Sequence, residues 1–243
     1  MNYLKLKKAK EYPYKRESQS FVYYDGQAYI LSKNVELELK QFLQSKKLNQ
    51  FSLSDRIPVL AYGSNATVFQ LENKFKNLKD CVIPVLNCII NDYDVVYAGR
   101  ICSYGAVPAT MRYSQGSRAE IAITYLSEEQ LEIMHKSEAK GIAYDFVELN
   151  DVSYEINNAP MKKNIYTYLS LSNSLSINGE PIALSAINNK TRNLKSMTEV
   201  EVLKELYKKY GKFNSLDEFI LNNINDKSLR LSINKKLANA NIK

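Results

Sequence analysis

The stretch Pro58-Val59-Leu60-Ala61-Tyr62-Gly63-Ser64-Asn65 indicates a short apolar strand that ends in a turn. Pro58 can begin a strand without removing a needed ladder donor, and the apolar run after it is typical of a buried strand. Gly63 lacks a Cβ, so it can adopt a positive φ and let a ligand approach the backbone. Ser64 and Asn65 are residue types whose side chains accept hydrogen bonds from free helix amides.

An amphipathic helix is predicted directly after this turn. Apolar residues at spacings of three, four and three lie on one helix face: Val68, Leu71, Phe75 and Leu78. Backbone N–H groups and the positive end of the helix would then point out of the carboxyl edge of the strand. These features together predict an anion site at the Gly63 turn.

The bulk composition indicates a globular chain made of one domain with extensions. Of the 243 residues, 45% are hydrophobic and 24% are charged. The longest apolar stretch, residues 81–90, is interrupted by Pro84 and Asn87 and is too short to span a bilayer. No apolar signal-peptide core follows the first residues. We therefore expect a cytoplasmic protein with no membrane partner.

Cysteine and histidine are too scarce for several kinds of chemistry. The three cysteines, Cys81, Cys88 and Cys102, form no CxxC pair, and the single histidine is His135. A structural zinc site is therefore not expected, and any Ser–His–Asp or Cys–His scheme would have to use His135. The chemistry is expected to depend on carboxylates, hydroxyls and backbone amides, with no metal or organic cofactor.

The net charge of +7 raises the question of nucleic-acid binding. The lysines are spread along the chain and dense mainly at its two ends, and no basic motif interleaved with aromatic residues occurs. A solvated, lysine-rich surface explains the charge better, so a nucleic-acid partner is not expected. Clustering of the terminal lysines on one face would favour the opposite conclusion.

Three parts are predicted along the chain: an N-terminal extension over 1–56, a core over 57–170 and a helical C-terminal extension over 171–243. In the first part, Asp25-Gly26 between two strand-like runs predicts a hairpin with a primed two-residue turn. A helix over residues 35–44 follows this hairpin, and its candidate buried positions are Leu37, Leu39, Phe42 and Leu43.

Six strands are predicted in the core, at 57–62, 82–89, 94–101, 119–125, 143–150 and 164–169. Few long helices separate them, which favours an α+β fold built on a small mixed β-barrel over a doubly wound sheet. The C-terminal part is predicted to be helical from about residue 185, with Val200, Leu203, Tyr207 and Tyr210 lining one face.

A second candidate site lies on a helix that carries an acid on its apolar stripe. Ser127-Glu128-Glu129-Gln130 is a capping box, so this helix is predicted to begin at Ser127. At about 100° per residue, Leu131, Met134 and Glu138 share one face. An acid there is partly desolvated, and desolvation raises the pKa of a carboxyl toward the range that suits proton transfer. The alternative is that Glu138 ends a frayed helix in water.

These pieces, taken in order, resemble the gamma-glutamylcyclotransferase-like family. The order is Tyr62-Gly63-Ser64-Asn65, then the loop Gly105-Ala106-Val107-Pro108-Ala109-Thr110, then Gly116, then a Leu-Ser-Glu-Glu-Gln-Leu helix that closes on Glu138, with Tyr144 six residues later. A lone Tyr-Gly-Ser-Asn is a weak signal, whereas the ordered set is fairly specific. The resemblance covers residues 57–150.

The resemblance implies a small β-barrel with flanking helices and a pocket at its mouth. It also implies release of 5-oxoproline from a small γ-glutamyl amine, amino acid or peptide. In that reaction the α-amino group of the substrate attacks its own γ-carbonyl, so no protein nucleophile is needed. Glu138 would remove a proton from the α-ammonium group and later return one to the leaving amine.

The remaining site residues would bind the substrate. The amides of Gly63, Ser64 and Asn65 would hold either its α-carboxylate or the developing oxyanion. Tyr62 would wall the pocket, and Tyr144 would hydrogen-bond the substrate or Glu138. Each of these has a structural alternative: Tyr62 as the last core side chain of its strand, Ser64 as a turn residue, and Tyr144 as packing.

Departures from the family pattern leave the substrate and the partners open. Ala66 stands where a large aliphatic residue is common, and the extensions either cover the pocket, add a partner surface or form a homodimer. Two other functions compete with the enzyme: a non-catalytic metabolite-binding module on the same barrel, and a basic interaction protein. A Glu138 that is exposed, or paired away from the Gly63 turn, would favour the binding module.

Overall fold

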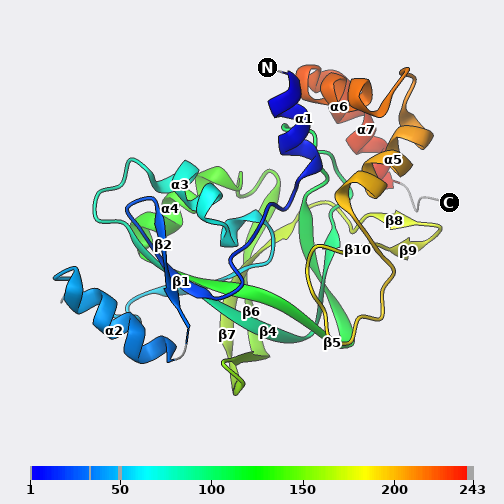
Figure 1. Ribbon diagram of the computed structural model, residues 1–243. Coiled ribbons are helices and arrows are strands. Elements are labelled where there is room, and N and C mark those ends of the chain that lie inside the picture. Colours follow the sequence, from blue (N-terminus) through cyan, green and yellow to red (C-terminus); the bar gives the residue numbers. More distant parts are fainter. Residues whose placement is uncertain (1, 33, 49–50, 240–243) are drawn as a thin grey trace. The chain divides into compact units, whose positions relative to one another are not determined.

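A computed structural model describes residues 2–32, 34–48 and 51–239 (Figure 1). Five strands close a ring in the order β4, β5, β3, β7, β6 and back to β4. These strands are β3 (Ile57–Ala61), β4 (Val82–Tyr97), β5 (Ala109–Leu126), β6 (Tyr144–Ile156) and β7 (Ala159–Ser170). β3 pairs with β7 in parallel, whereas β3 with β5 and β4 with β6 are antiparallel. The predicted mixed α+β class is confirmed, and the description of the ring as a barrel stays a prediction.

Shorter strands extend this sheet. β1 (Ser20–Tyr24) pairs with β2 (Gln27–Leu31) and with β4, and β10 (Ala183–Leu184) pairs with β4 and with β11 (Ser196–Met197). β8 (Ser176–Ile177) and β9 (Glu180–Pro181) form a separate pair. The helices are α1 (Asn2–Lys10), α2 (Val35–Ser45), the 3₁₀ helix η1 (Ser64–Ala66), α3 (Val68–Phe75), α4 (Glu128–Ser137), α5 (Glu199–Tyr210), α6 (Leu216–Asn225) and α7 (Lys227–Asn239).

The chain forms two compact units, and each is described by itself. The first unit comprises Met1–Tyr14, Asp92–Ala119 and Ser170–Lys243, and the second comprises Lys15–Asn91 and Glu120–Leu169. Both units are discontinuous in sequence because β4 and β5 each contribute one part to either unit. The three-part division predicted from the sequence stays a prediction.

One of the cores of the second unit lies between the ring and two helices. Its buried members come from every element that surrounds the candidate site: Val59 and Ala61 of β3, Leu71 and Phe75 of α3, Leu131 and Met134 of α4, Tyr144 of β6 and Tyr168 of β7. The apolar stripes predicted for both helices therefore face the same core.

The N-terminal hairpin of the second unit is confirmed. Asp25 and Gly26 have φ values of 49° and 72°, which is the primed turn that matches the twist of the flanking strands. The predicted helix after it is α2, in which Leu39 and Phe42 are buried. Leu37, also expected inside, is 51% exposed.

β4 is one continuous strand where the sequence predicted two, at 82–89 and 94–101. Asp92 adopts a φ of 61° within the strand, and its Oδ1 accepts a hydrogen bond from the amide of Gly116 on β5 at 2.7 Å. Gly116 also has a positive φ, of 77°. β4 therefore continues through a local bend at Asp92, and β5 through one at Gly116. The bend in β4 lies where the sequence predicted a break between two strands.

β6 and β7 also extend beyond their predicted limits. They meet in a turn at Asn157 and Asn158, whose φ values are 51° and 62°. Asparagine tolerates this left-handed conformation better than most residues. The two-residue turn accounts for strands longer than the predicted 143–150 and 164–169.

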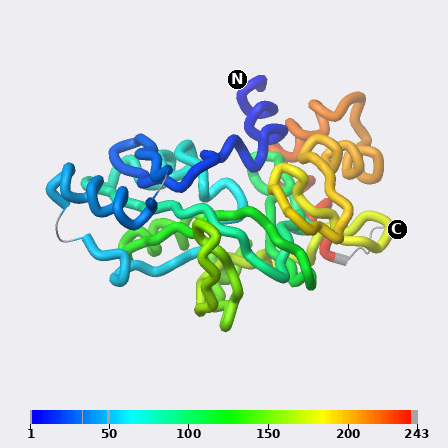
Figure 2. Tube along the Cα trace, turned by 60° about the horizontal axis from the view of Figure 1, so that its bottom comes forward, coloured from blue at the N-terminus to red at the C-terminus, as the bar shows by residue number. Residues whose placement is uncertain are grey.

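Helices of the first unit gather around α6, and Figures 1 and 2 both show α1 beside it. The Lys5 ammonium donates to Asn225 Oδ1 at 2.8 Å, and Lys10 pairs with Asp217 at 2.5 Å. The predicted helical stretch from residue 185 was too long. Strands and loops continue to Met197, and α5 begins only after the Thr198 capping box.

The buried face of α5 also differs from the predicted one. It comprises Glu199, Val202, Leu203 and Leu206, so only Leu203 of the four predicted residues is on it. Glu199 is buried in the first turn, where its Oε1 accepts a hydrogen bond from the Val107 amide at 2.7 Å. Burial raises the pKa of this carboxyl well above its ordinary value.

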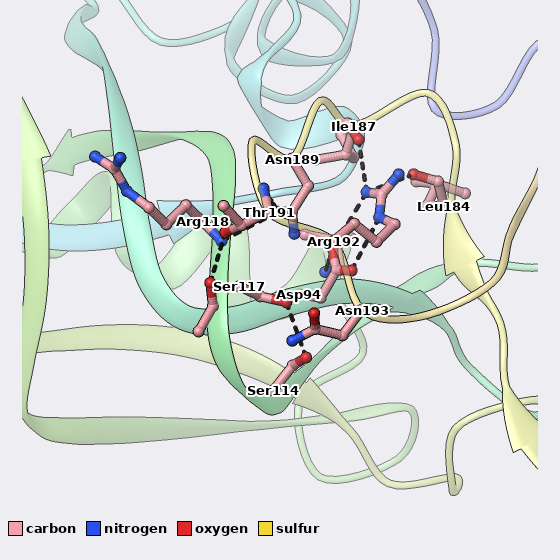
Figure 3. A network of polar contacts seen from close by, with 12 residues as sticks. Asp94, Ser114, Ser117, Arg118, Leu184, Ile187, Asn189, Thr191, Arg192 and Asn193 are labelled. Atoms are coloured by element: carbon pink, nitrogen blue, oxygen red, sulfur yellow. Dashed lines mark hydrogen bonds and ion pairs between the residues drawn. The ribbon is translucent and has the colours of Figure 1, made fainter.

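A polar network fixes the segment before α5 to β4 and β5 (Figure 3). Arg192 binds Asp94 through two nitrogens, at 2.9 and 3.2 Å. Thr191 donates to the Gly116 carbonyl oxygen at 2.5 Å, and Asn193 donates to the Gln115 carbonyl oxygen at 2.8 Å. A segment without regular structure is thereby held by side chains.

The three cysteines are buried and form no disulfide. Burial raises the pKa of the Cys81 and Cys88 thiols to about 12 and that of Cys102 to about 11. None of the helices within the described ranges is both long enough and apolar enough to cross a membrane.

Candidate active site

The turn after β3 differs in detail from the predicted one. Gly63 has a φ of −102° and a ψ of −138°, so the turn does not use a positive φ. Ser64 and Asn65 belong to η1, and the cap of α3 is Thr67, whose Oγ1 accepts from the Gln70 amide at 3.3 Å. The first amides of a helix have no partner within it, so the amides of Ser64 and Asn65 make no hydrogen bond inside η1.

Asn65 of this turn meets Glu138, although the two residues lie 73 positions apart. The Asn65 Nδ2 group donates to Glu138 Oε1 at 3.1 Å. The predicted capping box at Ser127 starts α4, and Glu138 is the C-cap residue of the same helix. Its side chain is 17% exposed, so the carboxylate is largely removed from solvent at the Gly63 turn. The catalytic role of Glu138 stays a prediction.

Lys74 on α3 completes the arrangement, and sequence reasoning missed it. Its Nζ lies 2.6 Å from Glu138 Oε1, 2.6 Å from Asn65 Oδ1 and 3.1 Å from Met134 Sδ. Its side chain is only 10% exposed. Within the described chain, both hydrogen bonds that Glu138 accepts through its side chain end on Oε1.

A signal for Lys74 was present in the helical periodicity. At about 100° per residue, Lys74 lies about 60° from Leu71, at the edge of the apolar stripe of α3. Glu138 was singled out because it lies on the stripe of its own helix. Taken together, a lysine beside the apolar stripe of α3 and a glutamate on the stripe of α4 predict an ion pair between the two helices. Taken alone, a lysine on a helix is usually solvated.

Two tyrosines predicted to contact the substrate are both buried in this unit. The Tyr62 hydroxyl donates to the backbone oxygen of Tyr168 and so joins the end of β3 to β7. Tyr144 is 7% exposed and packs in the same core as Met134 and Tyr168. Their roles toward a substrate stay predictions.

His135 and Tyr168 form a neutral pair beside Glu138. His135 Nδ1 lies 2.6 Å from the Tyr168 hydroxyl oxygen. Burial, followed by the nearby Glu138 carboxylate, raises the pKa of the Tyr168 hydroxyl. Burial, followed by the Lys140 ammonium, lowers the pKa of His135. The buried ion pair beside these two residues is that of Lys74 and Glu138.

The cluster combines a hydrogen-bonded carboxylate, an ammonium group and a carboxamide. The carboxylate can exchange a proton with a bound amine, and the ammonium can bind an anion. Among the described residues, no group of three or more His, Cys, Asp or Glu side chains could hold a metal ion.

No family model matches the sequence, and no curated protein matches it. Several solved structures are similar to the chain at low identity. A gamma-glutamyl cyclotransferase is 15% identical with a TM-score of 0.38, and the match covers 46% of this chain and 65% of that chain. YkqA from Bacillus subtilis is 14% identical with a TM-score of 0.39, over 86% of this chain and 72% of that chain.

An uncharacterised protein from Homo sapiens is 14% identical with a TM-score of 0.38, over 48% of this chain and 70% of that chain. Such values are too low to establish a family or an activity. The chemistry open to the site is therefore decided by its own residues.

Proposed function

We propose that the protein is a gamma-glutamyl cyclotransferase that releases 5-oxoproline from a small γ-glutamyl amine, amino acid or peptide. The hydrogen bond between Asn65 and Glu138 carries this proposal, because it joins the strand–turn motif to the candidate acid/base at 3.1 Å. On this proposal the five-stranded ring is the small β-barrel of the family, and the site lies at its mouth.

Glu138 would act as the general acid/base. It would accept a proton from the α-ammonium of the substrate, and the freed amine would attack the γ-carbonyl. The new C–N bond closes the five-membered lactam, and the C–N bond to the leaving amine breaks as Glu138 returns the proton. Lys74 and Asn65 both contact Oε1, which leaves Oε2 as the oxygen that would transfer the proton.

The turn would bind the anionic part of the reacting substrate. The backbone amides of Gly63, Ser64 and Asn65 would be suited to an oxyanion or a carboxylate, because backbone donors are oriented before the reaction begins. Tyr62 would shape the pocket through its buried ring, and Tyr144 would hydrogen-bond the substrate or Glu138. A soluble γ-glutamyl compound is the one partner that this proposal requires.

The test is 5-oxoproline release from a panel of γ-glutamyl amines and dipeptides by the wild type and by Glu138→Gln. The near-isosteric change keeps a hydrogen-bond acceptor but removes the exchangeable proton, so we expect a rate loss of about 10²- to 10⁴-fold. Glu129→Gln on the exposed side of α4 is the matched control and should keep wild-type turnover. Full activity in Glu138→Gln would discard Glu138 as the acid/base.

A metabolite-binding module without turnover is the second candidate. The ion pair with Lys74 favours it, because a largely buried ion pair gives Glu138 a role that needs no proton transfer. The pairing occurs at the Gly63 turn, however, where a substrate would be expected to bind. Saturable binding of a γ-glutamyl compound, measured by calorimetry with no 5-oxoproline released, would support this second function.

A further inference from the structure

The two opposite charges in the buried part of the candidate site balance each other. The Lys74 ammonium and the Glu138 carboxylate lie 2.6 Å apart, with side chains 10% and 17% exposed. Burial raises the pKa of the neighbouring Tyr168 hydroxyl and lowers the pKa of the His135 imidazole. Both shifts favour the uncharged form of the side chain. A ligand that left an unpaired charge here would be bound poorly, because a desolvated charge needs a partner.

A substrate ammonium by itself would upset this balance. On the proposed function, the α-ammonium of the substrate must contact Glu138 to give up its proton. Two cations, the substrate ammonium and Lys74, would then share one carboxylate. A second negative charge restores neutrality, and it must lie next to the substrate ammonium. In an α-amino acid head group, the α-carboxylate has this position.

Lys74 has a donor to offer such a carboxylate. An ammonium group carries three N–H donors. Two of those on Lys74 are directed to Glu138 Oε1 and Asn65 Oδ1, both at 2.6 Å. The third contact is to Met134 Sδ at 3.1 Å, and a thioether sulfur is a weak acceptor. A carboxylate oxygen could replace the sulfur without breaking either strong hydrogen bond.

We propose that Lys74 binds the α-carboxylate of the substrate and thereby restricts the site to γ-glutamyl compounds in which that carboxylate is free. This inference rests on the proposed function and specifies its substrate. The Asn65 carboxamide hydrogen-bonds to both Lys74 and Glu138 and so fixes the positions of the two side chains. Glu138 Oε2 contacts the α-ammonium. The four charges then alternate around the site.

The test compares a γ-glutamyl anilide with its α-carboxamide analogue, which keeps the ammonium and loses the negative charge. For each compound, kcat/KM is measured from anilide release, and Kd is measured by calorimetry. The wild type should prefer the free carboxylate by about 10- to 100-fold, the usual effect of one hydrogen bond between charged groups. Lys74→Met should remove that preference in both measurements.

Two further variants separate recognition from folding. Lys74→Arg keeps a cation and should retain part of the preference. Lys76→Met changes an exposed lysine just beyond the same helix and should retain all of it. Denaturation midpoints establish that each variant is folded before its selectivity is compared.

The outcomes distinguish this inference from the proposed function. A wild type without the preference, or an undiminished preference in Lys74→Met, overturns the role of Lys74 even where turnover is seen. A binding preference without turnover of either compound supports Lys74 as the carboxylate ligand and counts against the cyclotransferase activity. Absence of both binding and turnover overturns both.

Discussion

Among the described residues, a well-buried ion pair occurs in each unit, and the two pairs differ in how their carboxylates are hydrogen-bonded. Arg192 contacts both oxygens of Asp94, whose side chain is 0% exposed (Figure 3). The same guanidinium donates to the carbonyl oxygens of Ile187 and Leu184, at 2.7 and 3.4 Å. Asp94 Oδ1 also accepts from the Val95 amide at 2.8 Å. Both carboxylate oxygens of Asp94 are therefore hydrogen-bonded, to the Nε and Nη2 groups of Arg192 and to the Val95 amide.

The pair in the second unit uses less of its capacity. Lys74 and Asn65 both reach one oxygen of Glu138, and the third contact of Lys74 is to the sulfur of Met134. Both charged side chains also keep some exposure. A carboxylate that is hydrogen-bonded at both oxygens holds a segment in place, whereas a carboxylate with only one bonded oxygen can still bind a ligand. The difference separates a structural pair from a candidate site.

Removing one cation from each pair should give the largest contrast in stability. Arg192→Met leaves Asp94 buried without its partner, so we expect the free energy of unfolding to fall by about 3 to 5 kcal/mol. Lys74→Met should lose about 1 to 2 kcal/mol, because water can reach part of Glu138 and screens the lost attraction. Urea denaturation measures both, with the exposed Lys195→Met as control. Equal losses would remove the distinction between the two pairs.

Asn65→Ala sharpens the comparison at the site itself. The change removes the hydrogen bonds that orient both Glu138 and Lys74, so turnover should fall about tenfold while stability falls by about 1 kcal/mol. The assay is kcat for 5-oxoproline release, together with the denaturation midpoint. Asn77→Ala, an exposed asparagine in the loop after α3, should leave both unchanged. A purely structural Asn65 would lower the midpoint and spare kcat.

The smallest expected effect concerns the pH dependence of stability near the site. Burial and Lys140 lower the pKa of His135 below its usual 6.5, so the unfolded chain binds its proton more readily than the folded chain. Stability should therefore be complete above about pH 6.5 and decrease as the pH falls toward the lowered pKa. His135→Gln should flatten this slope between pH 7.5 and 5.5 in urea denaturation. An unchanged slope would assign it to other groups.

Features encoded within a few residues were predictable from the sequence. The Asp25-Gly26 turn and the Ser127 capping box each depend on neighbours within four positions, and both occur as expected. β4 was predicted as two strands, and Asp92, in the gap between them, is a residue type that is common in turns. Its actual conformation depends on Gly116, a partner from another strand that no local pattern reveals.

The candidate site shows the same limit. The periodicity of α4 identified Glu138, and the turn motif identified Asn65, but their contact requires two segments far apart in sequence. Lys74 was missed because its position at the edge of the α3 stripe becomes informative only when it is considered together with Glu138 on α4. Its charge is explained only by the carboxylate across the α3–α4 contact.

The buried cysteines make the folded chain well suited to site-specific labelling. All three thiols are inside and have raised pKa values, so little reactive thiolate is present at neutral pH. Asn158 lies at the exposed tip of the β6–β7 turn. A cysteine introduced there would react with a maleimide dye far faster than the native three. Fluorescence could then report ligand binding on a protein whose own cysteines need no replacement.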